Sequence, residues 1–521
     1  MKQQVWKKGV GAALTLVVAL SAAGCGQDAK EAVPSSAPNQ GTEKGKPVEL
    51  TMHMHYGDRY IYDNNFPVFK EAAKRTNVTL KGTASQTATN SKEMFNLMMV
   101  SGDIPDIVHY NVKGDFNKYG SEGAFAPLNE LIDKHAPNIK AFLEQRPDVK
   151  KFATAPDGKM YFLSFVPDGL VAKGWFIRQD WLKALNMQQP KTVDELYQVL
   201  KAFKEKDPNK NGKADEIPYF NRVNKGGAQD LLLFWNSYRG IYADQGKVKY
   251  GPYEANYETA VANIAKWYKE GLIDPEIFTR GAKAREVLLG DNVGGVSHDW
   301  FSSTAGYNDT LKDKVPGILF APMTPPASSD GVVREETKRA TVSESGWAIS
   351  ASNKHQVETI KYFDFWFTPE GRRLMNFGIE GVHYDLVDGK PKFKDSLLTG
   401  SKPVNEALQA DGAQMEVGFH QDFAYEEQWT NKTALAGVKE YNEKKYPIEQ
   451  FPVLTFTDGE KKKLDSIMKS IQTFTDEKFQ KWVLGSEPVA GNFEKFRQQL
   501  KAMGLDEVIS IQQAAYDRYM K

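Results

Sequence analysis

The fold is decided by Val48-Glu49-Leu50-Thr51-Met52-His53-Met54 and by the segments that follow it as far as Tyr110. This first stretch alternates apolar and polar residues in the manner of a half-buried strand. Residues 66–75 and 91–101 have helical spacing, whereas 77–80 and 106–110 resemble strands. The order strand, helix, strand, helix, strand predicts a parallel sheet with helices on its faces.

The same alternation recurs along the rest of the chain. We expect strands at 175–178, 293–298 and 346–350 and helices at 180–186, 193–206, 356–367, 458–482 and 492–503. Thr192 is a suitable N-cap for the helix at 193–206, with Glu195 at the capping-box position. The sequence therefore predicts an α/β protein with a helix-rich C-terminal part. A mature chain of about 500 residues is long for one domain and suggests two lobes.

The N-terminus has the pattern of an export signal. Lys2, Lys7 and Lys8 precede the apolar stretch 9–24, and small residues lead to Cys25, the only cysteine of the chain. This arrangement is typical of a secretory signal peptide. The apolar stretch is also shorter than the about 20 residues that a spanning helix needs. We therefore expect a signal peptide over residues 1–24.

Ser21-Ala22-Ala23-Gly24-Cys25 resembles the lipobox of bacterial lipoproteins, although Ala22 stands where leucine is commonest. The resemblance implies that the Cys25 thiol is acylated and that Cys25 becomes the first mature residue. Residues 25–46 are rich in Gly, Pro, Ser and charge and would form a lipidated flexible tether. Two acyl chains give stable anchoring, here at the outer face of the cell membrane. The alternative is an ordinary secretory signal with a chance cysteine.

Charge and cysteine content exclude several classes of protein. Cleavage before Cys25 would remove three lysines and no acid, leaving 64 basic and 67 acidic residues. A chain this close to neutral has no electrostatic reason to bind nucleic acid. If Cys25 is lipidated, the mature chain has no free cysteine, so disulfides, cysteine proteases and thiolate zinc sites are excluded. Aromatic residues make up 12% of the chain, and some of them could pack against sugar rings.

The sharpest internal motif is the loop that begins at Asp207. Side-chain oxygens stand at alternate positions, a glycine occupies the sixth place and a backbone carbonyl can serve from the seventh, as in the first nine positions of an EF-hand loop. Hard oxygen ligands at this spacing suit Ca²⁺. The expected ligands are Asp207, Asn209, Asn211, Lys213 through its carbonyl, Asp215 and Glu216.

The match ends before the twelfth position, where Pro218 replaces the usual bidentate glutamate. Glu216 is the substitute that we expect. Ile217-Pro218-Tyr219 cannot begin an exiting helix, so the calcium would have a structural role. The alternative is a polar turn without a metal, which Lys210 slightly favours.

With these motifs in place, the chain resembles the extracellular solute-binding proteins, family 1, of ABC importers. It is most similar to the large lipoprotein branch that includes LipO-like and alginate-oligosaccharide-binding proteins. The resemblance rests on the lipobox and on SGDIPDI (101–107), WFIRQDWL (175–182), the loop 207–218, GIEGVHY (378–384) and AYDRY (515–519).

The resemblance implies two α/β lobes that close on a ligand, with a periplasmic-binding-protein-like fold and hinge crossings near 164–168, near 340–344 and after Tyr384. The expected N-terminal lobe comprises 47–165 and about 342–384, and the C-terminal lobe 166–341 and about 385–521. The resemblance also implies an ABC permease as partner and a monomeric protein. In the alginate-binding relatives, the corresponding loop holds Ca²⁺ away from the ligand.

Ligands of open α/β sheets bind beyond the carboxyl ends of the strands. This rule selects residues that end or follow strands, and further aromatic residues lie in loops. The candidate ligand-binding residues are Tyr56, His109, Tyr110, Arg178, Trp235, Tyr238, His298, Asp299, Trp300, Glu380, His383, Tyr384 and Trp429.

These candidates would serve two kinds of sugar differently. A neutral sugar would stack on Trp300 and Tyr110 and hydrogen-bond to Asp299 and the histidines. An acidic sugar would instead need Arg178, Arg222 or Arg239. Each candidate could also be structural, and Arg178 could form an ion pair with Asp180.

The sequence favours a lipid-anchored receptor that captures an oligosaccharide and delivers it to a permease. A surface carbohydrate-active enzyme is the alternative, but Gly-x-Ser-x-Gly, His-Glu-x-x-His and phosphate-binding glycine loops are missing from the sequence. A pair of distant catalytic carboxylates remains compatible with it. A ligand sensor that feeds a membrane kinase would share the receptor fold.

Overall fold

A computed structural model describes residues 47–57, 60–169, 171–223, 227–281, 283–336, 339–400 and 402–521. The compact unit Lys46–Lys521 contains all of them. The expected signal peptide, Cys25 and the tether lie outside the described residues. Within these ranges, every helix is too short or too polar to cross a bilayer.

The first lobe is built on a six-stranded sheet whose main order is β2-β1-β4-β12-β5, with β3 paired to β1. Strand β1 is parallel to β3 and β4, as the sequence predicts, and β12 is antiparallel to β4. The strands are β1 Val48–Tyr56, β2 Tyr60–Ile61, β3 Val78–Gly82, β4 Ile107–Tyr110, β5 Leu163–Ser164 and β12 Gly346–Ile349.

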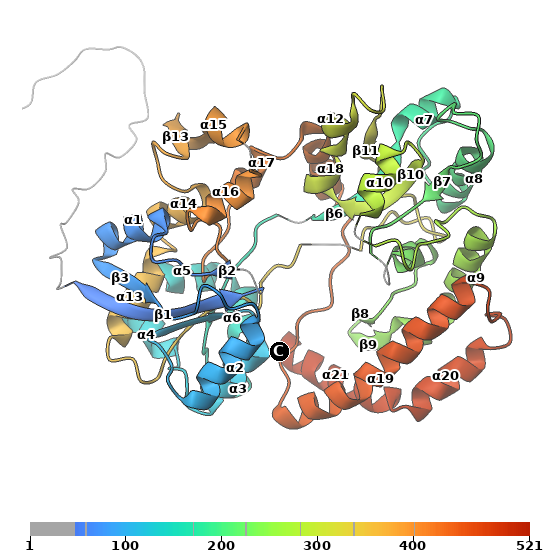
Figure 1. Cartoon of the computed structure of the whole chain (residues 1–521). Helices are drawn as coiled ribbons and strands as arrows, with labels where there is room; N and C mark the ends of the chain where they lie inside the picture. The colour runs from blue at the N-terminus through green and yellow to red at the C-terminus, as the bar shows by residue number, and fades with distance from the viewer. Residues whose placement is uncertain are drawn as a thin grey trace, which may run out of the picture. The chain divides into compact units, whose positions relative to one another are not determined.

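Helices and one hairpin surround this sheet (Figure 1). Helix α2 begins where the Asn90 side chain accepts a bond from the Glu93 N–H, and it ends at Gly102 in a left-handed conformation. The elements are α1 Pro67–Thr76, α2 Ser91–Ser101, α3 Lys113–Ser121, α4 Asn129–His135, α5 Pro137–Gln145, α6 Pro147–Ala153, α13 Gln356–Phe365, α14 Pro369–Phe377, β13 Tyr384–Val387, β14 Lys390–Phe393, α15 Asp395–Leu398, α16 Val404–Ala410 and α17 Ala424–Glu427.

The core of the first lobe extends further along the chain than the sequence indicates. Phe393, Leu408 and Phe419 are buried in it, although we assigned everything after about 384 to the second lobe. The chain does not leave this lobe after Tyr384, because β13 turns back at once to pair with β14. Buried residues between 393 and 425 therefore pack in the first lobe, and not in the second lobe as the expected boundary at about 384 implies.

The second lobe has a four-stranded sheet in the order β11-β6-β10-β7. Strand β10 is parallel to β7 and antiparallel to β6, and β11 is antiparallel to β6. Strand β7 follows the calcium-like loop directly, which agrees with the expectation that no helix leaves this loop. The strands are β6 Lys173–Arg178, β7 Ile217–Tyr219, β10 Gly294–Trp300 and β11 Phe320–Pro322.

Helices dominate the rest of this lobe, and the long C-terminal ones lie together in Figure 1. Thr192 caps α8 by accepting from the Glu195 N–H, but the Glu195 carboxylate bonds the Lys191 N–H, so the predicted capping box is only half formed. The elements are α7 Gln179–Ala184, α8 Val193–Glu205, η1 Ala228–Trp235, the hairpin β8 Ile241–Asp244 with β9 Lys247–Tyr250, η2 Gly251–Tyr253, α9 Ala255–Lys269, α10 Ala284–Gly290, α11 Phe301–Thr304, α12 Tyr307–Leu311, α18 Lys432–Glu443, α19 Asp458–Val483, α20 Phe493–Ala502 and α21 Leu505–Met520.

Three chain segments run side by side where the first sheet ends. Phe165 N–H donates to Ser345 O, and Ser343 N–H donates to Phe165 O. Val166 N–H donates to Phe419 O, and Gln421 N–H donates to Val166 O. Two of these segments coincide with the crossings expected near 164–168 and 340–344. The third is at 419–421 and not directly after Tyr384.

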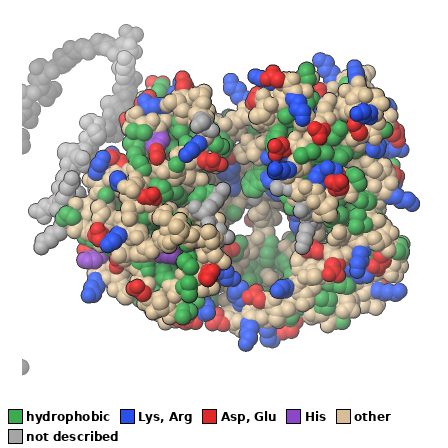
Figure 2. All heavy atoms as spheres, viewed as in Figure 1, with side chains coloured by type: hydrophobic (Ala, Val, Ile, Leu, Met, Phe, Trp, Pro, Cys, Tyr) green, Lys and Arg blue, Asp and Glu red, His purple; other side chains and the backbone are tan. Residues whose placement is uncertain are grey.

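The α/β, two-lobe prediction is confirmed, and the helix-rich C-terminal part is present. Basic and acidic side chains alternate over the face shown in Figure 2, without a large area of one sign. This agrees with the nearly balanced charge of the sequence.

Candidate functional site

Two tryptophans that the sequence singled out line the same hollow. Trp300 ends β10 and Trp429 follows α17, yet both border a cavity of about 290 Å³. The hollow lies beside the crossing segments, since Phe165, Gln421 and residues of the second lobe also line it. Its other lining residues are Pro167, Val171, Ala172, Phe301, Ser302, Arg339, Phe423, Glu426, Thr430 and Val438.

Trp300 is the most accessible aromatic candidate. Its side chain is 43% exposed, which is unusual for a tryptophan at the end of an otherwise buried strand. The Lys173 ammonium lies 5.7 Å from the centre of its ring, from the cross-strand partner position on β6. The ring centres of Trp429 and Tyr425 lie 6.1 Å apart, and the buried Trp429 indole N–H has no hydrogen-bond partner among the described residues. Trp300 therefore offers exposed ring surface to a ligand, and Trp429 borders the same hollow with its indole nitrogen buried.

Asp299 lies next to Trp300, but it is buried and both of its carboxylate oxygens already accept hydrogen bonds. Arg222 Nε binds both of its carboxylate oxygens at 2.8 and 3.0 Å, and Arg285 Nη1 binds one at 3.1 Å. The backbone N–H of Trp300 donates to it as well. Asp299 therefore holds two guanidinium groups in place and has no vacant acceptor position for the sugar hydroxyl that we expected it to bind.

His298 is the centre of a buried ionic network. Its Nδ1 lies 2.9 Å from Asp230 and its Nε2 lies 2.9 Å from Glu335. Burial lowers its pKa, but the charges of Glu335 and Asp230 outweigh burial and raise the pKa to about 10. Glu335 also exchanges backbone hydrogen bonds with Tyr446 and Ile448. The network thus joins β10 to two loop segments, which is a structural role.

Arg339 and Glu426 form an ion pair that the sequence analysis missed. Arg339 Nη1 and Nη2 donate to the two carboxylate oxygens of Glu426 at 2.7 and 2.8 Å. The guanidinium also lies over the Phe423 ring, at 5.6 Å. Gly169 packs here with φ +91°, where a Cβ would meet Phe423 at 2.9 Å. Arg339 and Phe423 lie outside regular elements and Glu426 lies in the short helix α17, so neither strand ends nor periodicity could select them.

A second hollow of about 510 Å³ borders the same segment from Arg339 to Val342. Tyr238, a predicted candidate, lines it and stacks on Tyr242 with 4.2 Å between ring centres. Phe451 and Tyr516 form a second stacked pair at 5.6 Å. This hollow is therefore also rich in aromatic surface.

Several candidates at the end of the first sheet are part of its core. His109 is fully buried, with Nε2 at 2.8 Å from Glu416 O, and burial lowers its pKa to about 4. Tyr110 stacks on Phe95 with 4.0 Å between ring centres, and the Tyr56 hydroxyl accepts from the Glu416 N–H. Strand β4 pairs with β12 as far as Tyr110, so these side chains are still inside the sheet where we expected its edge.

The remaining candidates lie away from both hollows. His383 bonds Ile379 and Asp411, Tyr384 is buried in the first core, and Glu380 is exposed at the surface. Trp235 is buried against Trp267. Arg178 is 1% exposed and binds Asp180 at 2.6 and 2.9 Å, so the ion-pair alternative describes it correctly.

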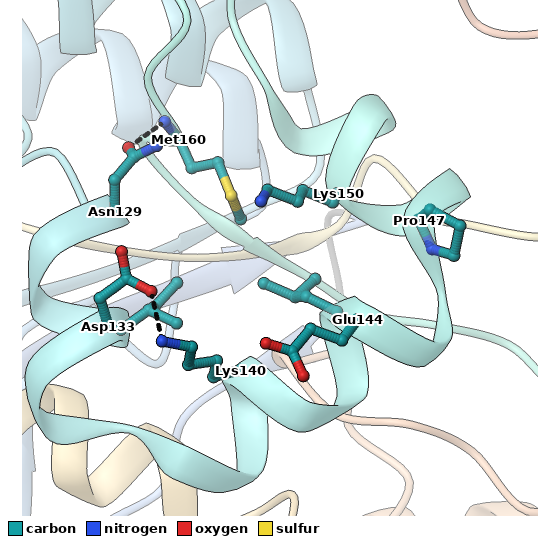
Figure 3. Close-up of a pocket in the computed structure, with 9 residues that line it drawn as sticks. Asn129, Asp133, Lys140, Glu144, Pro147, Lys150 and Met160 are labelled. Atoms are coloured by element: carbon teal, nitrogen blue, oxygen red, sulfur yellow. Dashed lines mark hydrogen bonds and ion pairs between the residues drawn. The ribbon is translucent and has the colours of Figure 1, made fainter.

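A further hollow, of about 260 Å³, lies between α4, α5 and α6 (Figure 3). Asp133 and Lys140 form an ion pair of 3.1 Å across it, and the Met160 N–H donates to Asn129 Oδ1. Its lining contains no aromatic ring and none of the predicted residues. It lacks the flat apolar surface that sugar rings prefer, so we do not assign the ligand to it.

The calcium-like loop folds around its own oxygens. Asp207 accepts from the N–H groups of Asn211 and Gly212, and Asn211 Oδ1 accepts from the Lys213 N–H. The Asn211 amide also contacts Asp215 at 3.1 Å. Gly212 has φ +75°, which explains the glycine at the sixth place. The loop thus brings Asp207, Asn211 and Asp215 together in one turn.

The surroundings of Glu216 indicate whether the residues of this loop fit a cation. Glu216 is 1% exposed, and neither carboxylate oxygen has a hydrogen-bond partner among the residues that the structure describes. Burial raises its pKa, and the charges of Asp207 and Asp215 raise it further. Three or more His, Asp or Glu side chains do not converge on a metal position anywhere in the described ranges. An orphaned carboxylate beside Asp207, Asp215 and two asparagine amides nevertheless fits an oxygen-coordinated cation.

Comparisons with known proteins agree with this fold. The chain is 26% identical to the fructooligosaccharide ABC transporter substrate-binding protein FusA of Streptococcus pneumoniae, over 87% of each protein. It is 27% identical to lipoprotein LipO of Bacillus subtilis, over 62% of this chain and 65% of LipO. The crystal structure of the alginate-binding protein AlgQ2 without calcium ion superposes with a TM-score of 0.76 and 46% identity, covering 91% of this chain and 98% of AlgQ2.

The resemblance noted in the sequence is therefore confirmed. Residues 59–373, more than half of the chain, match the family described as bacterial extracellular solute-binding protein. FusA and AlgQ2 are both named as binding proteins. The chain belongs to the bacterial extracellular solute-binding protein family.

Proposed function

We propose that this protein is the substrate-binding protein of an ABC importer, and that it captures an oligosaccharide between its two lobes. The observation that carries the proposal is the hollow shared by Trp300 and Trp429 beside the crossing segments. Aromatic rings and neutral hydrogen-bonding groups such as Gln421 and Thr430 are the surfaces that sugars require. FusA and AlgQ2, whose names specify a fructooligosaccharide and alginate, support a sugar ligand.

In this proposal the ligand contacts Trp300 and Trp429, and Tyr238 in the adjoining hollow extends the aromatic surface. The closed form would be the one that the permease recognises. The Arg339–Glu426 ion pair would fix the geometry of the crossing segments at which the lobes move. The other residues chosen from the sequence would support the fold and not contact the ligand.

The test is a titration of the chain from residue 26, which contains the whole compact unit Lys46–Lys521. Oligosaccharides from plant and algal polymers are added, and the sugar is recovered afterwards for analysis. Saturable binding with unchanged sugar supports the proposal. Cleavage of the sugar would identify an enzyme instead. Permease genes beside this gene would favour transport over sensing.

We also propose that Cys25 carries the lipid that keeps the receptor at the outer face of the membrane. The similarity to lipoprotein LipO supports this proposal. Replacing Cys25 with serine should release the protein from the membrane fraction into the medium. Retention of the Cys25→Ser variant in that fraction would contradict the anchor.

The loop from Asp207 to Glu216 is the proposed structural calcium site. Asp207, Asn209, Asn211, Asp215 and Glu216 would supply side-chain oxygens, and Lys213 its carbonyl. The cation would neutralise the carboxylates that crowd this loop. The orphaned Glu216 carboxylate and the relation to AlgQ2, crystallised in a form described as lacking calcium, support the proposal.

A further inference from the structure

The calcium-like loop contains Asn211-Gly212, the only Asn-Gly pair in the sequence. An asparagine followed by glycine is prone to a reaction within its own chain, because the backbone nitrogen of the glycine can attack the side-chain amide carbon and close a small ring. Glycine favours this closure, since it has no Cβ to hinder the attack and turns its backbone freely. The loop therefore carries a candidate site of covalent modification outside the sugar hollow.

The structure leaves this pair accessible. Asn211 and Gly212 are both exposed, so water reaches the reacting groups. A Cβ built on Gly212 would meet nothing within 4 Å, and its φ of +75° lies in the left-handed region that glycine enters easily. Two other asparagines are followed by serine, but Ser91 and Ser237 are buried. Packing therefore restrains those two pairs more than Asn211-Gly212.

Each of the three atoms that would react has a polar neighbour. The Gly212 N–H donates to Asp207 Oδ2 at 2.9 Å, which increases the electron density on the attacking nitrogen. The Lys213 N–H donates to Asn211 Oδ1 at 2.8 Å, which polarises the carbonyl that is attacked. Asn211 Nδ2, the leaving nitrogen, donates to Asp215 Oδ1 at 3.1 Å. The loop therefore presents a polarised amide beside its nucleophile in the chain.

We propose that Asn211 deamidates spontaneously when the loop holds no cation. The Gly212 nitrogen forms a bond to Asn211 Cγ, the Cγ–Nδ2 bond breaks, and water carries the proton of the Gly212 N–H to the ammonia that leaves. A water molecule then adds to either carbonyl of the succinimide ring and opens it to aspartate or isoaspartate at position 211. Water is the only reactant consumed, and ammonia is the only product released.

A bound cation would slow this reaction, and that part of the inference rests on the proposed calcium site. Asn211 would supply its side-chain oxygen there, so the amide that must rotate for ring closure would be fixed. The products would disturb the loop. Aspartate adds a negative charge beside Asp207, Asp215 and Glu216, and isoaspartate lengthens the backbone inside the turn. Deamidation would therefore destabilise the loop in the absence of a cation.

Peptide mass spectrometry of the chain from residue 26 tests the inference. The protein is incubated with chelator in mildly alkaline buffer, and samples are digested at intervals. We expect the peptide with Asn211 to gain about one mass unit, as aspartate and isoaspartate forms, at least about tenfold faster than the peptides with Asn90 or Asn236. No gain at position 211, an equal rate at the three asparagines, or a gain without isoaspartate would overturn the inference.

Variants and calcium separate the parts of the inference. Gly212→Ala should slow the gain about tenfold by hindering the attack, whereas Gly246→Ala, at an equally open glycine with φ +80°, is the matched control and should not. Asn211→Asp, which stands for the aspartate product, should unfold at a lower urea concentration than the wild type in chelator. An unchanged rate in Gly212→Ala would overturn the ring mechanism. Equal rates in calcium and in chelator would overturn the protection by calcium and leave both the deamidation and the sugar receptor standing.

Discussion

Replacing Glu216 with glutamine should change the stability of the protein in opposite directions with and without calcium. The Glu216 carboxylate is buried, has no hydrogen-bond partner in the described part of the chain and is affected by the charges of Asp207 and Asp215. Its pKa is raised above the ordinary value of 4.5, first by burial and then by these charges. Without a cation, the folded state therefore loses stability as the pH rises above about 4.5, where the unfolded carboxyl ionises.

The magnitudes follow from this environment. At neutral pH without calcium, Glu216→Gln removes a buried charge but leaves an unpaired amide, so we expect a gain of about 1 kcal/mol. With calcium at 100 times its dissociation constant, the wild-type protein gains about 2.7 kcal/mol. If the variant binds calcium 100-fold more weakly, it gains only ~0.4 kcal/mol. The variant should then be about 1 kcal/mol less stable than the wild type.

Urea unfolding of the chain from residue 26 measures both differences, in excess calcium and in chelator. Glu205→Gln, which removes an exposed acid on α8 just before the loop, is the control and should behave as the wild type in both buffers. A wild-type stability that is the same in calcium and in chelator would refute the structural-calcium proposal. A Glu216→Gln variant that responds to calcium as the wild type does would refute the role of Glu216.

Three further changes test other parts of the account. Trp300→Ala and Trp429→Ala should each weaken sugar binding about tenfold, equivalent to ~1.4 kcal/mol by calorimetry. Val382→Ala, at an exposed position, is the control and should not weaken it. Unaffected binding in both tryptophan variants would show that the hollow is not the sugar site. Charged His298 contributes stability that is complete below pH 6.5 and is lost as the pH rises towards about 10. The unfolding free energy of the wild type should therefore fall over that pH range more than that of His298→Asn. Parallel curves of unfolding free energy against pH would contradict the charged network. Arg339→Gln should cost about 2 kcal/mol of stability by leaving Glu426 unpaired, and adding Glu426→Gln should recover part of it; additive losses would show that the two residues are not coupled.

The regular elements were predictable because their patterns are local. The alternation at 48–54 and the helical spacing at 91–101 correspond to β1 and α2, and Pro218 correctly excluded a helix after the calcium-like loop. The hairpin after Tyr384 was not predictable in this way. Sequence spacing alone does not distinguish a strand that pairs locally, as β13 does with β14, from a segment that crosses to the other lobe.

The candidate site was predictable only in part. Trp300 was found because it ends a strand, and Trp429 because it lies in a polar aromatic stretch. His109 and Tyr110 satisfied the same strand rule, but β12, which is distant in sequence, extends the pairing of β4 and buries both. Arg339 and Glu426 carry no local signal, since their ion pair forms only when two crossing segments meet.

The most direct test of the receptor account is a crystal structure of the chain with a bound oligosaccharide. The account predicts one sugar chain in the hollow beside the crossing segments, with rings packed on Trp300 and Trp429 and all glycosidic bonds intact. A sugar bound elsewhere, for example in the hollow between α4, α5 and α6, or a sugar found cleaved, would contradict it.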